Sequence, residues 1–155
     1  MNVEYLGNME LLEQEIVAFL APSQVSPLAV LPTLDWATDI AQIGKVVVSG
    51  FSSRLEKEVW SVLARGTSPI VLVTVQHRYK RVPKELRSLL DCNRLLIISL
   101  GLAHRLSRPL AAKCNAYVAS LAAKLVFPSI DETSTLYLIY QSASTAGKTV
   151  TILQQ

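Results

Sequence analysis

Residues 45–75 read KVVVSGFSSRLEKEVWSVLARGTSPIVLVTV and decide the fold class. The β-branched run at 45–48 is too short and too apolar for a surface helix, and it predicts a buried strand. Residues 54–65 carry leucine and valine at helical spacing, and Gly66 marks the end of that helix. A second β-branched run follows at 70–75. The stretch therefore predicts a strand–turn–helix–strand unit of a parallel sheet.

The turn of this unit, residues 49–53 (SGFSS), is a candidate ligand site. A strand that enters a helix through small residues presents free backbone N–H groups at the positive end of the helix, and this geometry receives phosphate or carboxylate. A plain tight turn is the alternative, because one Ser-Gly pair is far weaker than a full glycine fingerprint.

Strand and helix patterns alternate along the rest of the chain. The predicted strands are 15–20, 45–48, 70–75, 94–100, 124–127 and 149–153, and the predicted helices are 27–43, 54–65, 83–90, 108–122 and 131 or 133 to 146. We expect a single Rossmann-like α/β domain over residues 1–155, a three-layer sandwich around a mostly parallel six-stranded sheet. Trp36 and Trp60 are expected to be core residues of their helices.

The composition is apolar for a chain of 155 residues, with 50% hydrophobic residues and a mean hydropathy of +0.34. Buried parallel strands explain part of this excess, and an apolar homodimer interface would explain more. No apolar run reaches the roughly 20 residues that span a bilayer. Residues 1–15 are acidic and lack the order of a secretion signal, so we expect a cytoplasmic protein with no membrane partner.

Cysteine and histidine usage argues against a metal site. Cys92 and Cys114 are widely spaced and fit reduced thiols better than a disulfide framework. His77 and His104 have no cysteine or carboxylate at ligand spacing, and no carboxylate partner that would orient them for acid–base chemistry. We expect them to be solvated or to contact phosphate.

The net charge of +3 hides an asymmetry, since residues 77–113 hold nine basic and two acidic side chains whereas residues 1–76 hold four basic and eight acidic ones. In a parallel sheet the loops that follow the strands lie at one edge, where ligands bind. Basic loops would therefore surround the 49–53 turn, which predicts an anionic ligand, with solvated loops as the alternative. The predicted nucleic-acid rim comprises Arg78, Tyr79, Lys80, Arg81, His104, Arg105 and Arg108.

Tyr79 is the aromatic member of this rim. An aromatic ring between two cations can stack on a nucleic-acid base. An exposed loop tyrosine without a ligand is the alternative.

Residues 49–58 (SGFSSRLEKE) resemble the SGFxSxxEKE segment of short DprA/Smf-like proteins, which are relatives of the Rossmann-like core of DNA-processing protein A. Residues 5–12, 33–37, 108–122 and 147–150 resemble further segments of that family in the same order, over nearly the whole chain. The resemblance implies a Rossmann-like fold, binding of single-stranded DNA on a basic groove, and dimerisation. The wider superfamily includes nucleotide sensors and nucleotide-processing enzymes.

The resemblance and the 49–53 turn together define the predicted ligand residues. They are Ser23, Ser49, Gly50, Phe51, Ser52, Ser53, Arg54, Asn115 and Ser134. Three segments depart from the family pattern: 22–24 (PSQ) lacks the arginine of GSR, Cys114 and Ala116 replace two arginines, and 128–132 (PSIDE) replaces a glycine-rich loop. These changes remove close backbone approach to a phosphate and add negative charge.

We therefore expect a protein that binds single-stranded DNA or a phosphate-bearing ligand at the carboxyl edge of the sheet, with no cofactor beyond a nucleotide or phosphate. The alternatives are a small-nucleotide sensor, a degenerate nucleotide-processing enzyme, or a structural dimer that has lost its ligand. We find no catalytic constellation. The serines of the turn lack a nearby base, Glu56 and Glu58 do not share a helix face, and the PGGxGTxxE motif of the hydrolytic branch is absent.

Overall fold

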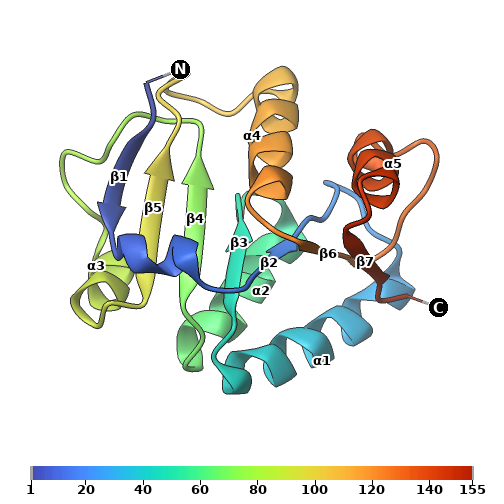
Figure 1. Cartoon of the computed structure of the whole chain (residues 1–155), viewed down its shortest axis with the longest axis horizontal. Helices are drawn as coiled ribbons and strands as arrows, with labels where there is room; N and C mark the ends of the chain where they lie inside the picture. Colours follow the sequence, from blue (N-terminus) through green and yellow to red (C-terminus); the bar gives the residue numbers. More distant parts are fainter. Residues whose placement is uncertain (1, 155) are drawn as a thin grey trace.

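Seven strands form one sheet in the computed structural model, which describes residues 2–154 (Figure 1). The elements in chain order are β1 (Glu4–Gly7), the 3₁₀ helix η1 (Met9–Glu13), β2 (Ile16–Phe19), α1 (Pro27–Ile43), β3 (Val46–Ser49), α2 (Arg54–Arg65), β4 (Ile70–Thr74), α3 (Lys84–Asp91), β5 (Leu95–Ser99), α4 (Arg108–Ser120), β6 (Lys124–Phe127), α5 (Tyr137–Thr145) and β7 (Thr149–Ile152). The strand order is β1-β5-β4-β3-β2-β6-β7.

The predicted Rossmann-like three-layer fold is confirmed, with one strand more than expected. All neighbouring strands run parallel except β1, which pairs antiparallel with β5 from Glu4 opposite Ser99 to Gly7 opposite Leu96. The sequence of β1, EYLG, contains no β-branched run and is largely exposed. Its extended conformation depends on the long-range pairing with β5, which local sequence does not reveal.

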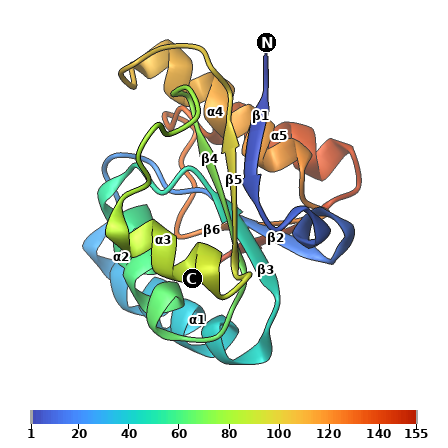
Figure 2. The same ribbon diagram turned by 90° about the vertical axis from the view of Figure 1, so that its left-hand side faces the viewer.

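Two hydrophobic cores lie on opposite faces of the sheet. Helices α1, α2 and α3 cover one face, and α4, α5 and η1 cover the other (Figure 2). Alternate residues of the central strands enter each core, as Val46 and Val48 do on one face and Val47 on the other. Burial on both faces explains the continuous apolar runs of the strands and much of the high mean hydropathy.

The helix ends follow from local side-chain chemistry. Helix α1 begins with Ser26 as its N-cap, followed by Pro27, and it continues through Pro32. Helix α5 begins at Tyr137, later than the sequence predicted. The reason is that Asp131 accepts hydrogen bonds from the backbone and hydroxyl of Thr133, at 2.9 Å each, and holds that segment in a turn.

The topology determines where a ligand can bind. The parallel strands β2 to β7 all end at the same edge of the sheet, which we call the carboxyl edge. The chain leaves β5 and crosses to β6, on the other side of β2, so the strand order reverses between β2 and β6. Ligands of open α/β sheets bind outside the carboxyl ends of the strands, above all at such a reversal.

Candidate functional site at the carboxyl edge

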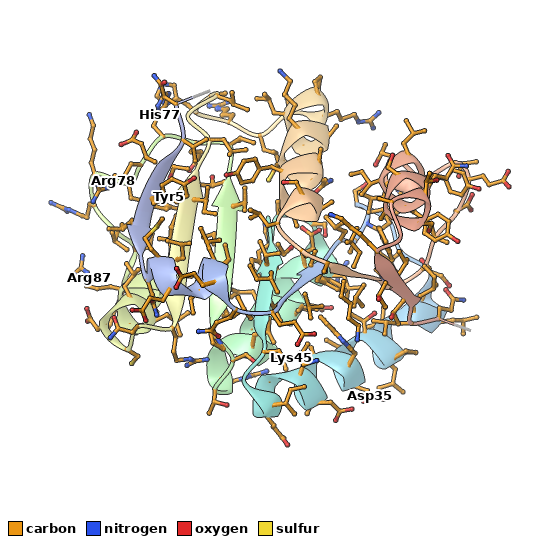
Figure 3. All side chains as sticks on the ribbon, viewed as in Figure 1. Tyr5, Asp35, Lys45, His77, Arg78 and Arg87 are labelled. Atoms are coloured by element: carbon orange, nitrogen blue, oxygen red, sulfur yellow. The ribbon has the colours of Figure 1, made fainter. Side chains whose placement is uncertain are left out.

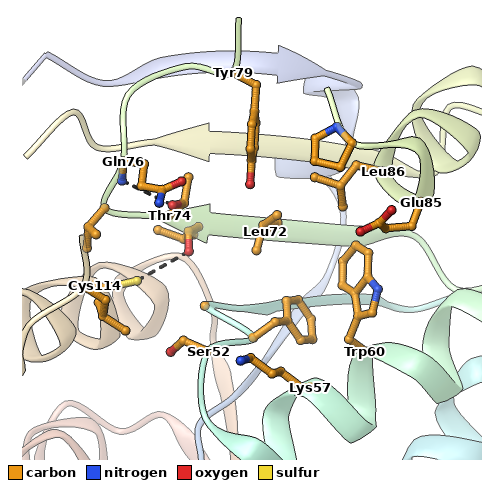
Figure 4. Close-up of a pocket in the computed structure, with 16 residues that line it drawn as sticks. Ser52, Lys57, Trp60, Leu72, Thr74, Gln76, Tyr79, Glu85, Leu86 and Cys114 are labelled. Atoms are coloured by element: carbon orange, nitrogen blue, oxygen red, sulfur yellow. Dashed lines mark hydrogen bonds between the residues drawn. The ribbon is translucent and has the colours of Figure 1, made fainter. Parts of the chain in front are cut away.

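Two cavities open along the carboxyl edge. The first, which we call the aromatic cavity, has a volume of about 530 Å³ and lies over β4 between α2 and the β4–α3 loop; its lining includes Phe51, Trp60, Leu72, Tyr79, Leu86 and Leu106 (Figure 4). The second, the polar cavity, has a volume of about 590 Å³ and lies at the reversal between β2 and β6; its lining includes Ser23, Ser26, Arg108, Asp131, Ser134 and Gln154. Both volumes fall in the range of small-ligand sites.

The structure divides the predicted ligand residues between these cavities. Gly50, Phe51 and Ser52 line the aromatic cavity, and Ser23 and Ser134 line the polar cavity. The remaining predicted ligand residues, Ser49, Ser53, Arg54 and Asn115, line neither of them. Five of the nine predicted ligand residues thus line one cavity or the other.

Three backbone amides of the 49–53 turn, those of residues 51–53, are already used within the chain. Phe51 N donates to Ser49 Oγ at 3.1 Å, and the amides of Ser52 and Ser53 donate to Glu56 Oε1 at 3.0 and 3.2 Å. These are the N–H groups that the sequence analysis assigned to a phosphate. A phosphate would have to displace the Glu56 carboxylate to reach them.

Glu56 is held in place from two loops. Its Oε2 accepts a hydrogen bond from Ala21 N at 3.0 Å, which ties the end of β2 to the start of α2. The side chain is buried, with 1% of its surface exposed, and this burial raises the pKa of the Glu56 carboxyl against the opposing effect of its backbone hydrogen bonds. Ser53 and Glu56 form a reciprocal capping box. The Ser-x-x-Glu spacing was the sequence signal for this arrangement, and the sequence analysis missed it.

Space around the glycine of the turn is tight. A Cβ atom at Gly50 would lie 3.2 Å from Cys114 Sγ, so the Cys114 side chain would have to shift slightly to admit it. Phe51 follows with a φ of +48°, unusual for a bulky residue, and its ring packs edge-to-face on Trp60 with centroids 5.1 Å apart. The turn therefore directs an aromatic ring to the cavity wall.

Trp60 packs against the hydrophobic core as expected, but only in part. Its side chain is half-buried and lines the aromatic cavity, rather than lying wholly in the core. Trp36 is also half-buried, but it lines neither cavity and stacks on Phe19 with ring centroids 5.2 Å apart. Helical spacing alone could not distinguish these two tryptophans.

The β4–α3 loop and the β5–α4 loop, which carry most residues of the predicted rim, are hydrogen-bonded to each other. Gln76 Nε2 donates to the His104 carbonyl at 3.0 Å, and Gly101 N donates to the Gln76 carbonyl at 3.0 Å. The His77 and His104 rings lie 5.8 Å apart. Arg78 projects outward from these loops (Figure 3). The residues of the predicted rim thus come from adjacent loops, although 22 or more positions separate the two groups in the sequence.

Some cations of the 77–113 segment lie elsewhere. Arg94 precedes β5 at the opposite edge of the sheet, where Nη2 donates to the carbonyls of Leu63 at 3.0 Å and Ser68 at 3.1 Å. It caps the end of α2 and does not belong to the rim. The cations of the two loops and the first turn of α4 are Arg78, Lys80, Arg81, Arg105 and Arg108, and we call them the basic rim.

Among residues 2–154, the side chains offer no group of three or more His, Cys, Asp or Glu that could hold a metal ion. Within the same range, no helix has the length and apolar character needed to cross a bilayer. The features that the structure does provide at the carboxyl edge are hydroxyls, aromatic rings and guanidinium groups.

A mostly parallel, doubly covered sheet whose strand order reverses between β2 and β6 defines a Rossmann-like α/β domain. Within that class, the fold is that of DNA processing protein A (DprA). The Helicobacter pylori protein, whose structure concerns its single-stranded DNA binding mode, matches 99% of this chain and 72% of its own with a TM-score of 0.74 and 16% identity. The Streptococcus pneumoniae DprA matches 96% of this chain with a TM-score of 0.72 and 16% identity, and this chain spans 53% of that protein.

A second group of solved structures shares the fold more distantly. The molybdenum cofactor binding protein from Rippkaea orientalis matches 88% of this chain and 74% of its own with a TM-score of 0.61 and 15% identity. No protein-family model and no curated protein matches the sequence. The DprA-like fold expected from residues 49–58 is confirmed by three-dimensional similarity.

Proposed function

We propose that this protein binds single-stranded DNA along the basic rim. The observation that carries the proposal is the hydrogen-bonded junction of the β4–α3 and β5–α4 loops, because four of the five rim cations belong to these two loops and the fifth, Arg108, follows directly in the first turn of α4. Arginine and lysine neutralise phosphates without regard to sequence, and aromatic rings stack on unpaired bases. Similarity in fold to a DprA with a single-stranded DNA binding mode supports the proposal.

The rim can serve both cavities. Leu106 lines the aromatic cavity and Arg108 lines the polar cavity, so the segment between them connects the two. A strand that follows this segment would meet Arg105 and Arg108 in succession. Polymer binding therefore uses a surface that a single small ligand would cover only in part.

Salt dependence tests the proposal. We would titrate a fluorescently labelled single-stranded oligonucleotide with the protein and measure anisotropy at several salt concentrations. Contact of all five rim cations with phosphates predicts a slope of about −3.5 for log affinity against log salt, from roughly −0.7 per phosphate. A slope near zero, or no binding at low salt, would contradict it.

A small phosphate-bearing ligand is the second candidate, and the polar cavity favours it. Its lining combines serine and threonine hydroxyls with one cation, Arg108. Asp131 opposes a highly charged ligand there, because hydrogen bonds from Thr133 lower the pKa of the exposed Asp131 carboxyl. A mononucleotide in this cavity would saturate one-to-one and raise the melting temperature with little dependence on salt.

We also propose that the protein is a homodimer and binds without catalysis. Leu28 and Leu31 expose 75% and 68% of their surfaces at the start of α1, which is apolar surface that a second copy would cover. Sedimentation velocity over a range of protein concentrations tests the dimer; a single monomeric species throughout would contradict it.

A further inference from the structure

We propose that the aromatic cavity is a base-binding slot that takes one unpaired nucleobase. The inference rests on the proposed function in that the base belongs to the same phosphate-bearing ligand. The basic rim would hold the phosphates of this ligand, and the aromatic cavity would hold one of its bases.

The walls of the cavity suit a flat ring. Tyr79 reaches in from the β4–α3 loop and Trp60 from α2, with Leu72 of β4 between them in the view of Figure 4. Phe51 braces Trp60 edge-to-face, so the indole is fixed before a ligand arrives. Tyr79 and Trp60 are each half-buried, which leaves part of each ring free to contact a ligand.

Polar side chains complete the lining of the cavity beside these rings. Lys57 and Glu85 line the cavity as a donor and an acceptor, together with Gln76 (Figure 4). Gln76 donates from Nε2 to the His104 carbonyl, and its Oε1 accepts no hydrogen bond from residues 2–154, so it can accept one from a ligand. The edges of nucleobases carry this mixture of donors and acceptors on a flat ring, whereas an aliphatic ligand would leave them unpaired.

The charges around Tyr79 fit the phosphate that accompanies a base. Arg78 and Lys80 flank Tyr79 directly in the sequence, and Arg81 follows. A base between Tyr79 and Trp60 would thus have its own phosphate next to the basic rim. Stacking on aromatic side chains with phosphates held by neighbouring cations is the general mode of single-strand recognition.

Trp60 fluorescence tests the slot directly. In the Trp36→Phe variant, Trp60 is the sole tryptophan, and phenylalanine preserves the stacking on Phe19. We would titrate this variant with a thymidine oligonucleotide, with an abasic oligonucleotide of equal length, and with thymidine monophosphate. The slot predicts that base-bearing ligands quench Trp60 and that the abasic strand does not.

Affinity gives a second readout. Tyr79→Ala should weaken binding of the thymidine oligonucleotide by about 5- to 150-fold, the range measured for loss of one stacked base, and leave the abasic strand unaffected. Tyr137→Ala, on α5 and outside the cavity, is the matched control and should change neither affinity. Melting curves would verify that both variants fold.

The outcomes separate the slot from the proposed function. Binding of both strands with equal affinity and no quenching would overturn the slot and leave the basic rim intact. Quenching by the monophosphate without oligonucleotide binding would support the slot and overturn single-strand binding. No quenching by any of the three probes would overturn the slot.

Discussion

Glu56 fills the anion-binding position at the start of α2 with a carboxylate of the chain itself. It accepts three backbone hydrogen bonds, from Ala21, Ser52 and Ser53, and no cation compensates its charge within hydrogen-bonding distance among the contacts of residues 2–154. A residue that stabilises the two loops in this way also occupies the Ser52 and Ser53 amides, which a ligand would otherwise reach. In the proposed function, the phosphate contacts are therefore assigned to the side chains of the basic rim.

Replacing the carboxylate with an amide should destabilise the fold. In Glu56→Gln, one oxygen can still accept from Ser52 and Ser53, but the Nε2 group would face the Ala21 N–H as a second donor. An unsatisfied buried donor costs about 1–3 kcal/mol. Urea denaturation at pH 7 measures this loss; Glu58→Gln, exposed on the same helix, is the control and should be nearly neutral.

The same carboxyl makes stability depend on pH. Because burial raises the pKa of Glu56 above its ordinary value of 4.5, the folded state holds this proton to higher pH than the unfolded state does. The stabilisation that the folded state gains from holding this proton is complete below pH 4.5, and it is lost as the pH rises through the pKa of Glu56 in the folded state. The stability of the wild type relative to Glu56→Gln should therefore fall over this window, and a constant difference would contradict the assignment.

The two cysteines should differ in reactivity. Burial raises the pKa of the Cys114 thiol to about 12, and its Sγ lies 3.5 Å from the Val73 carbonyl oxygen. Cys92 is exposed. A thiol reagent at pH 7 to 8 should modify one cysteine per native chain and two per unfolded chain, because only an accessible thiolate reacts. Rapid modification of two thiols in the native protein would show that Cys114 is accessible.

At the scale of elements, the contact between α1 and α2 depends on one glycine. A Cβ atom at Gly66 would lie 2.6 Å from Ala41 Cβ and 2.8 Å from the Ala41 carbonyl oxygen. Gly66→Ala should therefore force the helices apart and cost about 1–3 kcal/mol, as overpacking does. Thermal denaturation measures the effect. Ser61→Ala, exposed on α2, is the control, and equal melting temperatures for the two variants would contradict the prediction.

The elements that the sequence predicted well are those with strong local patterns. β3, α2 and β4 lie within one residue of their expected bounds, because β-branched runs and helical spacing act locally. β1 and the start of α5 were missed for a different reason. The first is defined by pairing with β5, and the second by hydrogen bonds that Asp131 and Ser134 accept in the preceding turn.

The site shows the same division. Loop positions at the carboxyl edge follow from the order of strands, so the basic rim could be located from the sequence. The sequence could not show whether the backbone amides of Ser52 and Ser53 are free, because this depends on the position of Glu56 Oε1. It also could not show the cavity beside Trp60, because the cavity depends on which part of α2 remains uncovered in the fold. Sequence patterns predict where side chains gather, and three-dimensional packing decides which of their atoms remain available.

Over the whole molecule, charge is distributed by edge. The basic rim lies at the carboxyl edge, whereas Lys45 forms an ion pair with Glu15 at the amino edge, with Nζ and Oε1 3.5 Å apart. Arg65 also lies at that edge, at the end of α2. Lys45 and Arg65 are thus two cations far from the rim. Replacing both with glutamate changes the net charge by the same amount as replacing two rim cations with glutamate.

The central claim is that the basic rim binds the phosphates of a single strand, and comparison of two charge-reversal variants tests it most directly. Arg81→Glu with Arg105→Glu should weaken oligonucleotide binding by at least about tenfold at low salt and reduce the salt slope by about 1.4. Lys45→Glu with Arg65→Glu has the same net charge and should retain most of the affinity. Equal affinities for the two variants, measured by anisotropy at the same ionic strength, would contradict the claim.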